Sequence, residues 1–386
     1  MSGAGLPFWE PHVEISLDNL AFNYAGILSA LDPGVGVMAV VKDSAYGCGS
    51  VQIGRALETA GAAYLAVARV CEAQALRRAG VDSPVLVLGP ADREQAVWAS
   101  GAGVTLSVSD PVYCRELAGT KLPLNIHCEI DTGMGRTGMS LQEVPAALEI
   151  LRTSDSLFCE GLFTHFACAD APDGSASARQ RKTFGEALRL FNGHGFAPRF
   201  VHCANSAAVF RMPGLKCNLV RPGIALYGCL PDPAQDFGVA LRPVAALKGR
   251  VLRLRRIPAG TPVSYGWTWR APADTCIAVV GIGYGHGLPR FLSNRGHVLI
   301  RGRRFPIRGT VTMDYVMVET GFDTGIEAGD EAVAMGYQDG ALISPDEIAL
   351  AGGTIGYEIL CGLNPALHRI WVRDGTTVCH SEGTIL

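Results

Sequence analysis

The chain has 386 residues, of which 48% are hydrophobic and 18% are charged, and its formal net charge at pH 7 is −3. This is the composition of a globular protein, and the nearly balanced charge offers no electrostatic basis for binding nucleic acid or an anionic membrane. No apolar run approaches the roughly 20 residues of a membrane-spanning helix. Residues 1–10 also lack the basic start and apolar core of a signal peptide. We therefore expect a cytoplasmic protein with no nucleic-acid or membrane partner.

The first part of the sequence alternates between strand and helix patterns. A short strand is expected over residues 12–17, with Asp18 as the cap of a helix that runs to residue 30. Apolar runs of strand length follow at 37–41, 63–68, 84–89, 104–108, 124–130, 161–166, 200–203 and 218–220. Amphipathic stretches separate most of them, at 50–60, 70–79, 93–100, 141–153 and 178–193. Eight strands with helical or loop connections over about 200 residues predict an N-terminal (β/α)8 TIM-type barrel, with a doubly wound sheet as the alternative.

The pattern changes after residue 236. Alternating β-branched segments, interrupted by Gly and Pro, occupy 244–255, 276–281, 297–300, 311–318 and 331–335. The next convincing helix covers 344–350. These features predict a mostly β C-terminal domain, so we place the domains at residues 1–240 and 241–386. We expect residues 1–11 to pack with the second domain.

The cysteines are numerous but isolated. All 12 are scattered singly between Cys48 and Cys379, without a C-x-x-C pair. Metal and redox sites need such local pairs, and disulfide scaffolds are short secreted chains. We therefore expect most of these cysteines to be small core residues, and we predict no metal site.

Candidate site residues, most of them polar, follow the predicted strands at their carboxyl ends, which is where TIM barrels build their active sites. In chain order these residues are Lys42, Tyr46, Glu129, Arg136, His165, His202, Asn205, Ser206, Arg221, Gly223 and Ile224.

Lys42 is the central residue of this group because it ends the apolar run 37–41, which is typical of a strand buried on both faces. A lone lysine there is more often one that extends its ammonium group to solvent. However, Ser206 and the backbone amides near Gly223 and Ile224 form a candidate anion cradle after strands seven and eight. No Walker pattern is present, and the glycines of 281–287 have the wrong spacing for a dinucleotide fingerprint. A phosphate cradle beside a reactive lysine predicts pyridoxal 5'-phosphate held as a Schiff base.

These segments resemble the motifs of the alanine racemase family, in the same order and along nearly the whole chain. In the barrel they are Val41-Lys-Asp-Ser-Ala-Tyr-Gly47, Asp131-Thr-Gly-Met-Gly-Arg-Thr-Gly138, Thr164-His-Phe-Ala167, Ala204-Asn-Ser-Ala-Ala208 and Arg221-Pro-Gly-Ile-Ala-Leu-Tyr-Gly228. In the second domain they are Val263-Ser-Tyr-Gly266, Gly283-Tyr-Gly285, Thr312-Met-Asp314 and Gly356-Tyr-Glu-Ile-Leu-Cys361. The resemblance implies a homodimeric, fold-type III pyridoxal phosphate enzyme that interconverts L- and D-alanine and supplies D-alanine for the cell wall.

The resemblance also implies two bases on opposite faces of the substrate. Lys42 matches the lysine that holds the cofactor and acts on the D-side, and Tyr265 matches the base for the L-side, contributed by the partner subunit. A tyrosine is a poor base at neutral pH, so it needs assistance. His165 matches the family's histidine that contacts this tyrosine.

The remaining roles concern the cofactor and the substrate carboxylate. Arg221 matches the arginine that faces the pyridine nitrogen; it keeps that nitrogen unprotonated and so suppresses side reactions. Barrel decarboxylases are expected to use an acidic residue there, so Arg221 argues against them. The other matches are Tyr46, Ser206, Gly223, Ile224 and Tyr357 at the phosphate, Asn205 and His165 at the cofactor, Arg136 and the Met313 N–H at the substrate carboxylate, Tyr284 with Tyr357 at the pocket mouth, and Glu129 and Asp314 as supporting residues.

The sequence departs from the family pattern at several positions. Glu129 stands where many members carry a carbamylated lysine, and we expect its carboxylate to pair with Arg136 in a bidentate manner. Asp43-Ser44, Cys48, Thr312 and Trp267 are further departures, and the last two lie near the matched pocket positions. A serine or broad-specificity racemase is therefore the alternative. A non-catalytic cofactor-binding protein is a third hypothesis, which the pair Lys42 and Tyr265 argues against.

Overall fold

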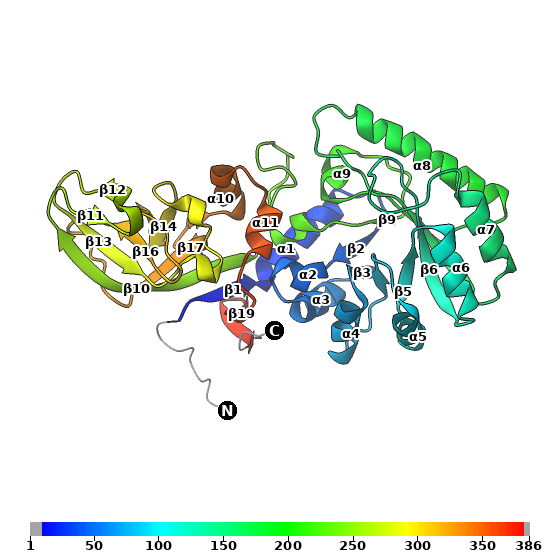
Figure 1. Cartoon of the computed structure of the whole chain (residues 1–386), viewed down its shortest axis with the longest axis horizontal. Coiled ribbons are helices and arrows are strands. Elements are labelled where there is room, and N and C mark those ends of the chain that lie inside the picture. The colour runs from blue at the N-terminus through cyan, green and yellow to red at the C-terminus, as the bar shows by residue number, and fades with distance from the viewer. Residues whose placement is uncertain (1–9, 382–386) are drawn as a thin grey trace.

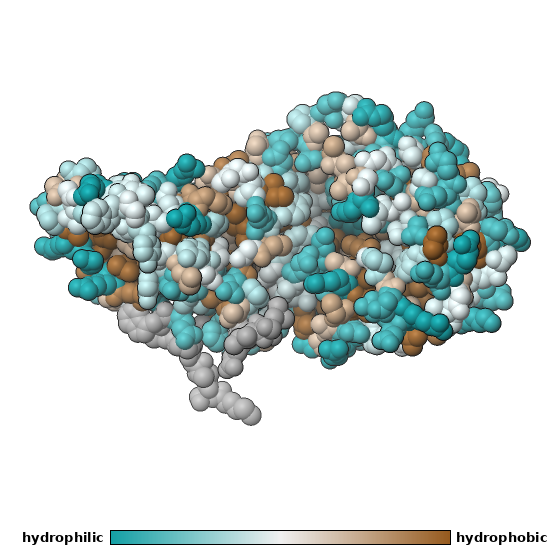
Figure 2. Space-filling view, in the orientation of Figure 1, coloured by the Kyte–Doolittle hydropathy of each residue, from teal (hydrophilic) through white to brown (hydrophobic). Residues whose placement is uncertain are grey.

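The computed structural model describes residues 10–381 and consists of a barrel followed by a β domain (Figure 1). In Figure 1 the barrel lies on the right and the β domain on the left, with α1 (Leu17–Ser29) between them. None of the helices in residues 10–381 is long and apolar enough to cross a membrane. On the face shown in Figure 2, hydrophilic and hydrophobic residues are interspersed.

Eight parallel strands close into the predicted TIM-type barrel, in which the last strand pairs with the first. These strands are β2 (Gly36–Val40), β3 (Tyr64–Val67), β4 (Val85–Val87), β5 (Thr105–Val108), β6 (Leu124–Glu129), β7 (Leu157–Phe163), β8 (Phe200–His202) and β9 (Leu219–Val220). Their predominantly apolar, buried side chains fill the barrel, as expected for parallel strands covered by helices. The barrel prediction is confirmed, and the doubly wound alternative is wrong because the sheet closes.

Helices surround the barrel between successive strands. They are α3 (Ser50–Thr59), α4 (Val70–Arg78), α5 (Arg93–Gly101), α6 (Pro111–Gly119), α7 (Val144–Thr153), α8 (Ser175–Gly193) and α9 (Ser206–Arg211), and a short turn, α2 (Lys42–Tyr46), follows β2. Helix α6 was not expected from the sequence. This helix has clear local causes, because the Asp110 carboxylate accepts the Tyr113 N–H at 2.8 Å and Pro111 occupies the first turn.

The predicted cap of α1 is wrong by two residues. The Ser16 hydroxyl, and not Asp18, accepts a backbone hydrogen bond, from the Asn19 N–H at 3.1 Å. Asp18 lies inside the first turn, and its carboxylate accepts the Asp374 N–H at 2.8 Å. Strand β1 (His12–Ser16) therefore leads directly into the helix.

The C-terminal part is mostly β, as predicted. Its main sheet contains β10 (Ala245–Ile257), β13 (Thr275–Val280), β14 (His297–Ile300), β15 (Arg303–Pro306), β16 (Val316–Glu319), β17 (Glu331–Gln338), β18 (Ala341–Ile343), β19 (His368–Arg373) and β20 (Thr376–Ser381). A separate hairpin consists of β11 (Pro262–Val263) and β12 (Trp269–Arg270). Helices α10 (Pro345–Gly352) and α11 (Gly356–Cys361) follow β18. The segment predicted as a strand over 311–318 is extended only from Val316, and its first part forms a turn.

Strand β1 belongs to the sheet of the C-terminal part, although it precedes the barrel in the chain. It pairs antiparallel with β10 and parallel with β19. The chain thus leaves the sheet, forms the barrel and returns to the sheet. The domain boundary at residues 240 and 241 stays a prediction, and residues 1–9, most of the segment expected to pack with the second domain, lie outside the described residues.

The cysteines only partly follow the expectation of a core location. Those that are buried are Cys48, Cys114, Cys128, Cys203, Cys229 and Cys276, whereas Cys71 and Cys361 are exposed.

Candidate active site

Lys42 follows the carboxyl end of β2, and the buried backbone before it is held by a hydrogen bond. The Tyr227 hydroxyl donates a hydrogen bond to the Val40 carbonyl at 2.8 Å. Four consecutive residues after Lys42, from Asp43 to Tyr46, have φ values of 53° or 54° and form a left-handed turn. Such a conformation costs roughly 1–2 kcal/mol per residue outside glycine. Lys42 is half-buried and lines a cavity.

One buried carboxylate ties this strained turn to the next unit of the barrel. Glu72, in the first turn of α4, accepts the Asp43 N–H at 2.6 Å through one oxygen. Its other oxygen accepts the Ala68 and Arg69 N–H groups at 2.9 and 3.0 Å. Sequence reasoning missed Glu72, because an acidic residue in a first helical turn is an ordinary feature. Its position shows how the protein stabilises the turn that orients Lys42.

A cavity of about 450 Å³ opens at the carboxyl ends of the barrel strands. This volume is in the range of small-molecule and cofactor sites. The predicted site residues that line it are Lys42, Tyr46, Glu129, Arg136, His165, Asn205, Ser206, Arg221, Gly223, Ile224 and Tyr357. Residues that also line it but were not predicted are Val40, Ala68, Leu88, Gly89, Thr137 and Phe163.

One side of the cavity forms a cradle of hydroxyl and amide groups. The Ser206 hydroxyl accepts the N–H groups of Gly223 at 3.0 Å and Ala225 at 3.4 Å. A Cβ atom at Gly223 would lie 2.5 Å from the Tyr46 hydroxyl, so only glycine allows this close approach. The rings of Tyr46 and Tyr357 are 6.1 Å apart. Hydroxyl groups that converge with backbone N–H groups suit a phosphate, so these residues fit the phosphate of pyridoxal phosphate.

Asn205 supports this cradle from the start of α9. Its carbonyl oxygen accepts the Ala208 N–H at 3.0 Å, which caps the helix, and its amide donates to the Phe166 carbonyl at 3.3 Å. The adjacent Ser206 is thereby fixed at the first helical position.

Arg221 is buried beside the cavity with its two terminal nitrogens fully engaged. Nη1 donates to His202 Nδ1 at 2.7 Å and to the His202 carbonyl at 3.0 Å. Nη2 donates to the Thr164 carbonyl at 2.7 Å and lies 3.3 Å from His165 Nδ1. These bonds use all four terminal N–H groups of the Arg221 guanidinium. Its fifth donor, Nε–H, is therefore the one that can bind a ligand.

His165 is electrically neutral in this environment. Burial, followed by the charge of Arg221, lowers its pKa to about 3. Because a guanidinium has no acceptor, the ring accepts at Nδ1 and carries its hydrogen on Nε2. The Gln180 side chain donates to the His165 carbonyl at 2.9 Å and so fixes the backbone at this strand end.

Glu129 and Arg136 both line the cavity, but the expected bidentate pair does not form. No ion pair joins these two residues, which both lie in the described part of the chain. The loop between them is shaped by Asp131 instead, whose carboxylate accepts the Gly133 and Met134 N–H groups at 2.8 Å each. Burial raises the pKa of Glu129 above its usual range.

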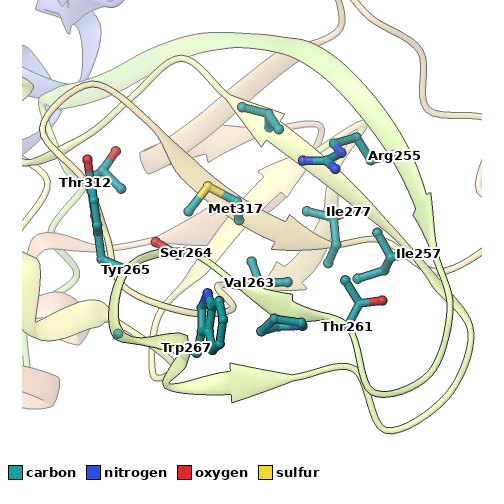
Figure 3. Close-up of a pocket in the computed structure, with 13 residues that line it drawn as sticks. Arg255, Ile257, Thr261, Val263, Ser264, Tyr265, Trp267, Ile277, Thr312 and Met317 are labelled. Atoms are coloured by element: carbon teal, nitrogen blue, oxygen red, sulfur yellow. The ribbon is translucent and has the colours of Figure 1, made fainter.

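Tyr265, which was assigned to catalysis in the partner subunit's site, does not line the cavity of its own barrel. It lies in the short helix η2 (Tyr265–Trp267) between β11 and β12, at the end of the molecule away from the barrel (Figure 1). Its side chain is 72% exposed. In Figure 3 the ring points toward Thr312 at the edge of a second cavity of about 480 Å³ in the β domain.

The backbone around Tyr265 is strained and is held by hydrogen bonds. Ser264 has a φ of 63°, in the left-handed region that favours glycine. Its hydroxyl donates to the Thr310 carbonyl at 2.5 Å, and the Thr310 hydroxyl donates to the Tyr265 carbonyl at 2.9 Å. The exposed Tyr265 ring is therefore attached to a backbone whose conformation is fixed by these hydrogen bonds.

Tyr284, Met313 and Asp314 are also exposed on the β domain and do not line the barrel cavity. The Tyr284 N–H donates to the Thr312 carbonyl at 2.9 Å, which joins the two turns that carry these residues. A Cβ atom at Gly283 would lie 2.3 Å from the Thr312 and Met313 carbonyl oxygens, so glycine is required at this crossing. The predicted site residues thus fall into two groups, one in the barrel cavity and one on the β domain.

Comparisons with known proteins cover both parts of the chain. Residues 15–231 match the model for the alanine racemase N-terminal domain, and residues 244–371 match that for the C-terminal domain. An alanine racemase from Geobacter sulfurreducens is 38% identical over 368 residues, covering 93% of this chain and 96% of the relative.

Solved structures agree with this. The alanine racemase from Bacillus anthracis with bound L-Ala-P has a TM-score of 0.89 at 35% identity, over 97% of this chain and 98% of that one. The alanine racemase from Bartonella henselae with covalently bound pyridoxal phosphate has a TM-score of 0.83 at 26% identity, over 94% and 99%.

Together, the closed barrel, the strand-end lysine, the phosphate cradle and the β domain define a fold-type III pyridoxal phosphate-dependent enzyme. Within that class, the chain belongs to the alanine racemase family.

Proposed function

We propose that this protein interconverts L- and D-alanine with pyridoxal phosphate and that it works as a homodimer with composite active sites. The observation that carries the proposal is the separation of two candidate bases. Lys42 lines the barrel cavity, whereas Tyr265 is 72% exposed on the far side of the β domain. A racemase needs a base on each face of the α-carbon, and a second copy supplies Tyr265 to the cavity of the first.

The barrel residues hold the cofactor. Lys42 would bind it covalently, and the cradle around Ser206 and Gly223 would hold its phosphate. The Nε–H of Arg221 would face the ring nitrogen and keep it unprotonated. When bound, the cofactor supplies an electron sink that makes the proton on the substrate's α-carbon easier to remove.

Proton transfer is shared between the two subunits. Lys42 takes or returns the α-proton on the D-side, and Tyr265 of the partner subunit does so on the L-side. The Nε2–H of the neutral His165 donates to the hydroxyl oxygen of that tyrosine and stabilises its deprotonated form. Racemisation results when one base removes the proton and the other returns it to the opposite face.

The substrate carboxylate is bound where the two groups of residues meet. Arg136 approaches it from the barrel, and Met313 and Tyr284 of the partner subunit approach from the β domain. Glu129 and Asp314 support these residues, and Tyr284 and Tyr357 narrow the entrance. The proposal includes a cytoplasmic location and a supply of D-alanine for the cell wall.

The decisive experiment incubates the protein and cofactor with single L-amino acids in deuterated water, followed by chiral separation and mass analysis. The expected main product is D-alanine with deuterium at the α-carbon. A preference for serine or a larger amino acid would keep the chemistry and reassign the pocket. Absence of α-exchange with every amino acid, despite bound cofactor, would contradict the proposed function. Full activity of a monomer in sedimentation and dilution assays would contradict the dimer.

A further inference from the structure

A chain of buried polar side chains leads away from Arg221 through the interior of the barrel. Arg221 Nη1 lies 2.7 Å from His202 Nδ1, and His202 Nε2 lies 2.8 Å from His127 Nδ1. His127 Nε2 then lies 3.5 Å from a carboxylate oxygen of Glu160. Arg221, His202 and His127 are almost completely buried.

The direction of these hydrogen bonds follows from the chemistry of the first member. Arg221 only donates, so His202 accepts at Nδ1 and carries its hydrogen on Nε2. His127 then accepts at Nδ1 and also carries its hydrogen on Nε2, which faces Glu160. Every donor therefore points from Arg221 toward Glu160, and the reverse order would set two donors against each other. Burial, with Arg221 adding to it, lowers the pKa values of both histidines, in keeping with neutral rings.

The chain of polar side chains ends, opposite Arg221, at one carboxylate oxygen of Glu160. Glu160 Oε1 accepts the Tyr64 hydroxyl at 2.7 Å and the Thr105 hydroxyl at 3.0 Å, and it is the same oxygen that His127 faces. Although burial alone would raise the pKa of Glu160, the His127 ring 3.5 Å away and the hydrogen bond from Tyr64 lower it. The carboxylate is thus ionised at neutral pH.

The chain of polar side chains from Arg221 to Glu160 runs along the barrel from its carboxyl end to its amino end. Tyr64 and Thr105 are the first residues of β3 and β5, at the amino end of the barrel, whereas Arg221 directly follows β9 at the carboxyl end. A Cβ atom at Gly161 would lie 2.3 Å from the His127 ring, so this glycine makes the space for it. The side chain of Glu160 is 20% exposed, so its charge reaches solvent at the end opposite the cavity.

We propose that Glu160 is a positioning residue for Arg221 and acts through His127 and His202. Its carboxylate acts together with Arg221 at the other end of the chain to favour the Nε2–H tautomer of both histidines, which keeps His202 Nδ1 free to accept from Arg221. Arg221 is thereby held with its remaining N–H toward the cavity. This inference rests on the proposed function, in which Arg221 faces the ring nitrogen of the cofactor.

Two substitutions at Glu160 separate charge from hydrogen bonding. Glu160→Gln keeps Oε1 as an acceptor for Tyr64, Thr105 and His127 but removes the negative charge. Glu160→Leu removes the acceptor as well, so the His127 Nε2–H loses its partner. Glu116→Gln, on the exposed surface of α6, is the matched control because it removes one carboxylate charge outside the barrel.

The primary measurement is ¹⁵N NMR of the imidazole rings in the full chain, with and without pyridoxal phosphate. We expect the Nε2–H tautomer for His127 and His202 in the unmodified protein and in Glu160→Gln, and mixed tautomers in Glu160→Leu. For alanine, we expect kcat to fall about threefold in Glu160→Gln and about tenfold in Glu160→Leu, with KM changing less than about twofold. The control variant keeps both spectra and rates.

The Nδ1–H tautomer at either histidine of the unmodified protein would overturn the proposal. Unchanged tautomers and kcat in Glu160→Leu would also overturn it. If Glu160→Leu does not fold, the spectra of the unmodified protein and kcat of Glu160→Gln decide the matter, and a kcat equal to that of the control counts against the proposal. Failure to racemise alanine while the tautomers are as expected would contradict the proposed function and leave the tautomer assignment intact.

Discussion

The Ser206 hydroxyl accepts the backbone N–H of Gly223 at 3.0 Å, so the first residue of α9 and the loop after β9 meet at a single oxygen atom. These two segments follow the last two strands of the barrel, where barrels commonly bind phosphate. Each partner of this contact can be tested separately.

Ser206→Ala should weaken binding of pyridoxal phosphate about tenfold. The cradle loses one hydroxyl group, whose hydrogen bond contributes roughly 1–1.5 kcal/mol to the free energy of binding. A cofactor titration followed by absorbance measures the change. Ser175→Ala, at an exposed serine that begins α8, is the control and should bind normally. Equal affinities for the two variants would remove Ser206 from the cradle.

Gly223→Ala should weaken cofactor binding more than Ser206→Ala does. The new methyl group would lie 2.5 Å from the Tyr46 hydroxyl and would displace it. We expect the affinity to fall at least about a hundredfold, as for a site misplaced by about 1 Å. Gly185→Ala, within α8 and clear of close neighbours, should instead stabilise the fold by up to about 1 kcal/mol. Normal cofactor affinity of Gly223→Ala would contradict the cradle geometry.

Mixed dimers should reveal whether two chains build each site. Lys42→Ala and Tyr265→Phe should each be inactive alone, with unchanged folds. After the two variants are unfolded together and refolded, half of the dimers are mixed, and one of the two sites in each mixed dimer is intact. We therefore expect about one quarter of the unmodified activity. Tyr315→Phe, at another exposed tyrosine of the β domain, should stay active. No recovery from an efficiently exchanged mixture would count against composite sites.

Glu129→Gln should reduce turnover roughly three- to tenfold while the cofactor stays bound, because a buried acceptor near the substrate site loses its ionisable oxygen. Steady-state racemisation and cofactor absorbance measure the two effects. Glu143→Gln, at an exposed carboxylate before α7, is the control. If turnover is unchanged, Glu129 has no supporting role.

The free energy of unfolding should fall as the pH drops below about 6.5. Burial lowers the pKa values of His127 and His202 from 6.5, so in this range the unfolded chain binds more protons than the folded one. The stabilising contribution is complete above pH 6.5 and decreases on acidification by at most about 1.4 kcal/mol per pH unit for each histidine. Urea unfolding at several pH values measures this slope. His127→Gln should reduce it, and exposed His194→Gln should not; a larger slope in the first variant would be inconsistent with a neutral His127.

Much of the barrel was predictable from the sequence because its signals are local. Apolar runs such as 37–41 and 63–68 coincide with β2 and β3 within one or two residues, since strands buried on both faces are continuously hydrophobic. The strand-end residues Lys42, Ser206 and Arg221 line one cavity because closure of the barrel brings the carboxyl ends together.

Other features depend on contacts that no local pattern indicates. The left-handed turn after Lys42 carries Asp43, Ser44 and Ala45 where glycine would be expected, and Glu72 is the partner that holds it. The expected pair of Glu129 and Arg136 does not form, and the loop between them folds around Asp131. The polar chain to Glu160 was missed for a similar reason, since its members come from strands far apart in the sequence.

The pairing of β1 with β19 has a consequence for the order in which the protein is made. Strand β1 is synthesised before the barrel, but its parallel neighbour, residues 368–373, emerges only after the whole barrel and nearly all of the β domain. The barrel strands can close during synthesis, since their pairings need nothing beyond residue 220. Strand β1 meanwhile has both edges unpaired, because β10 also follows the barrel in the chain. Strand β19 therefore completes the pairing of β1 only after the barrel that lies between them in the chain has been made.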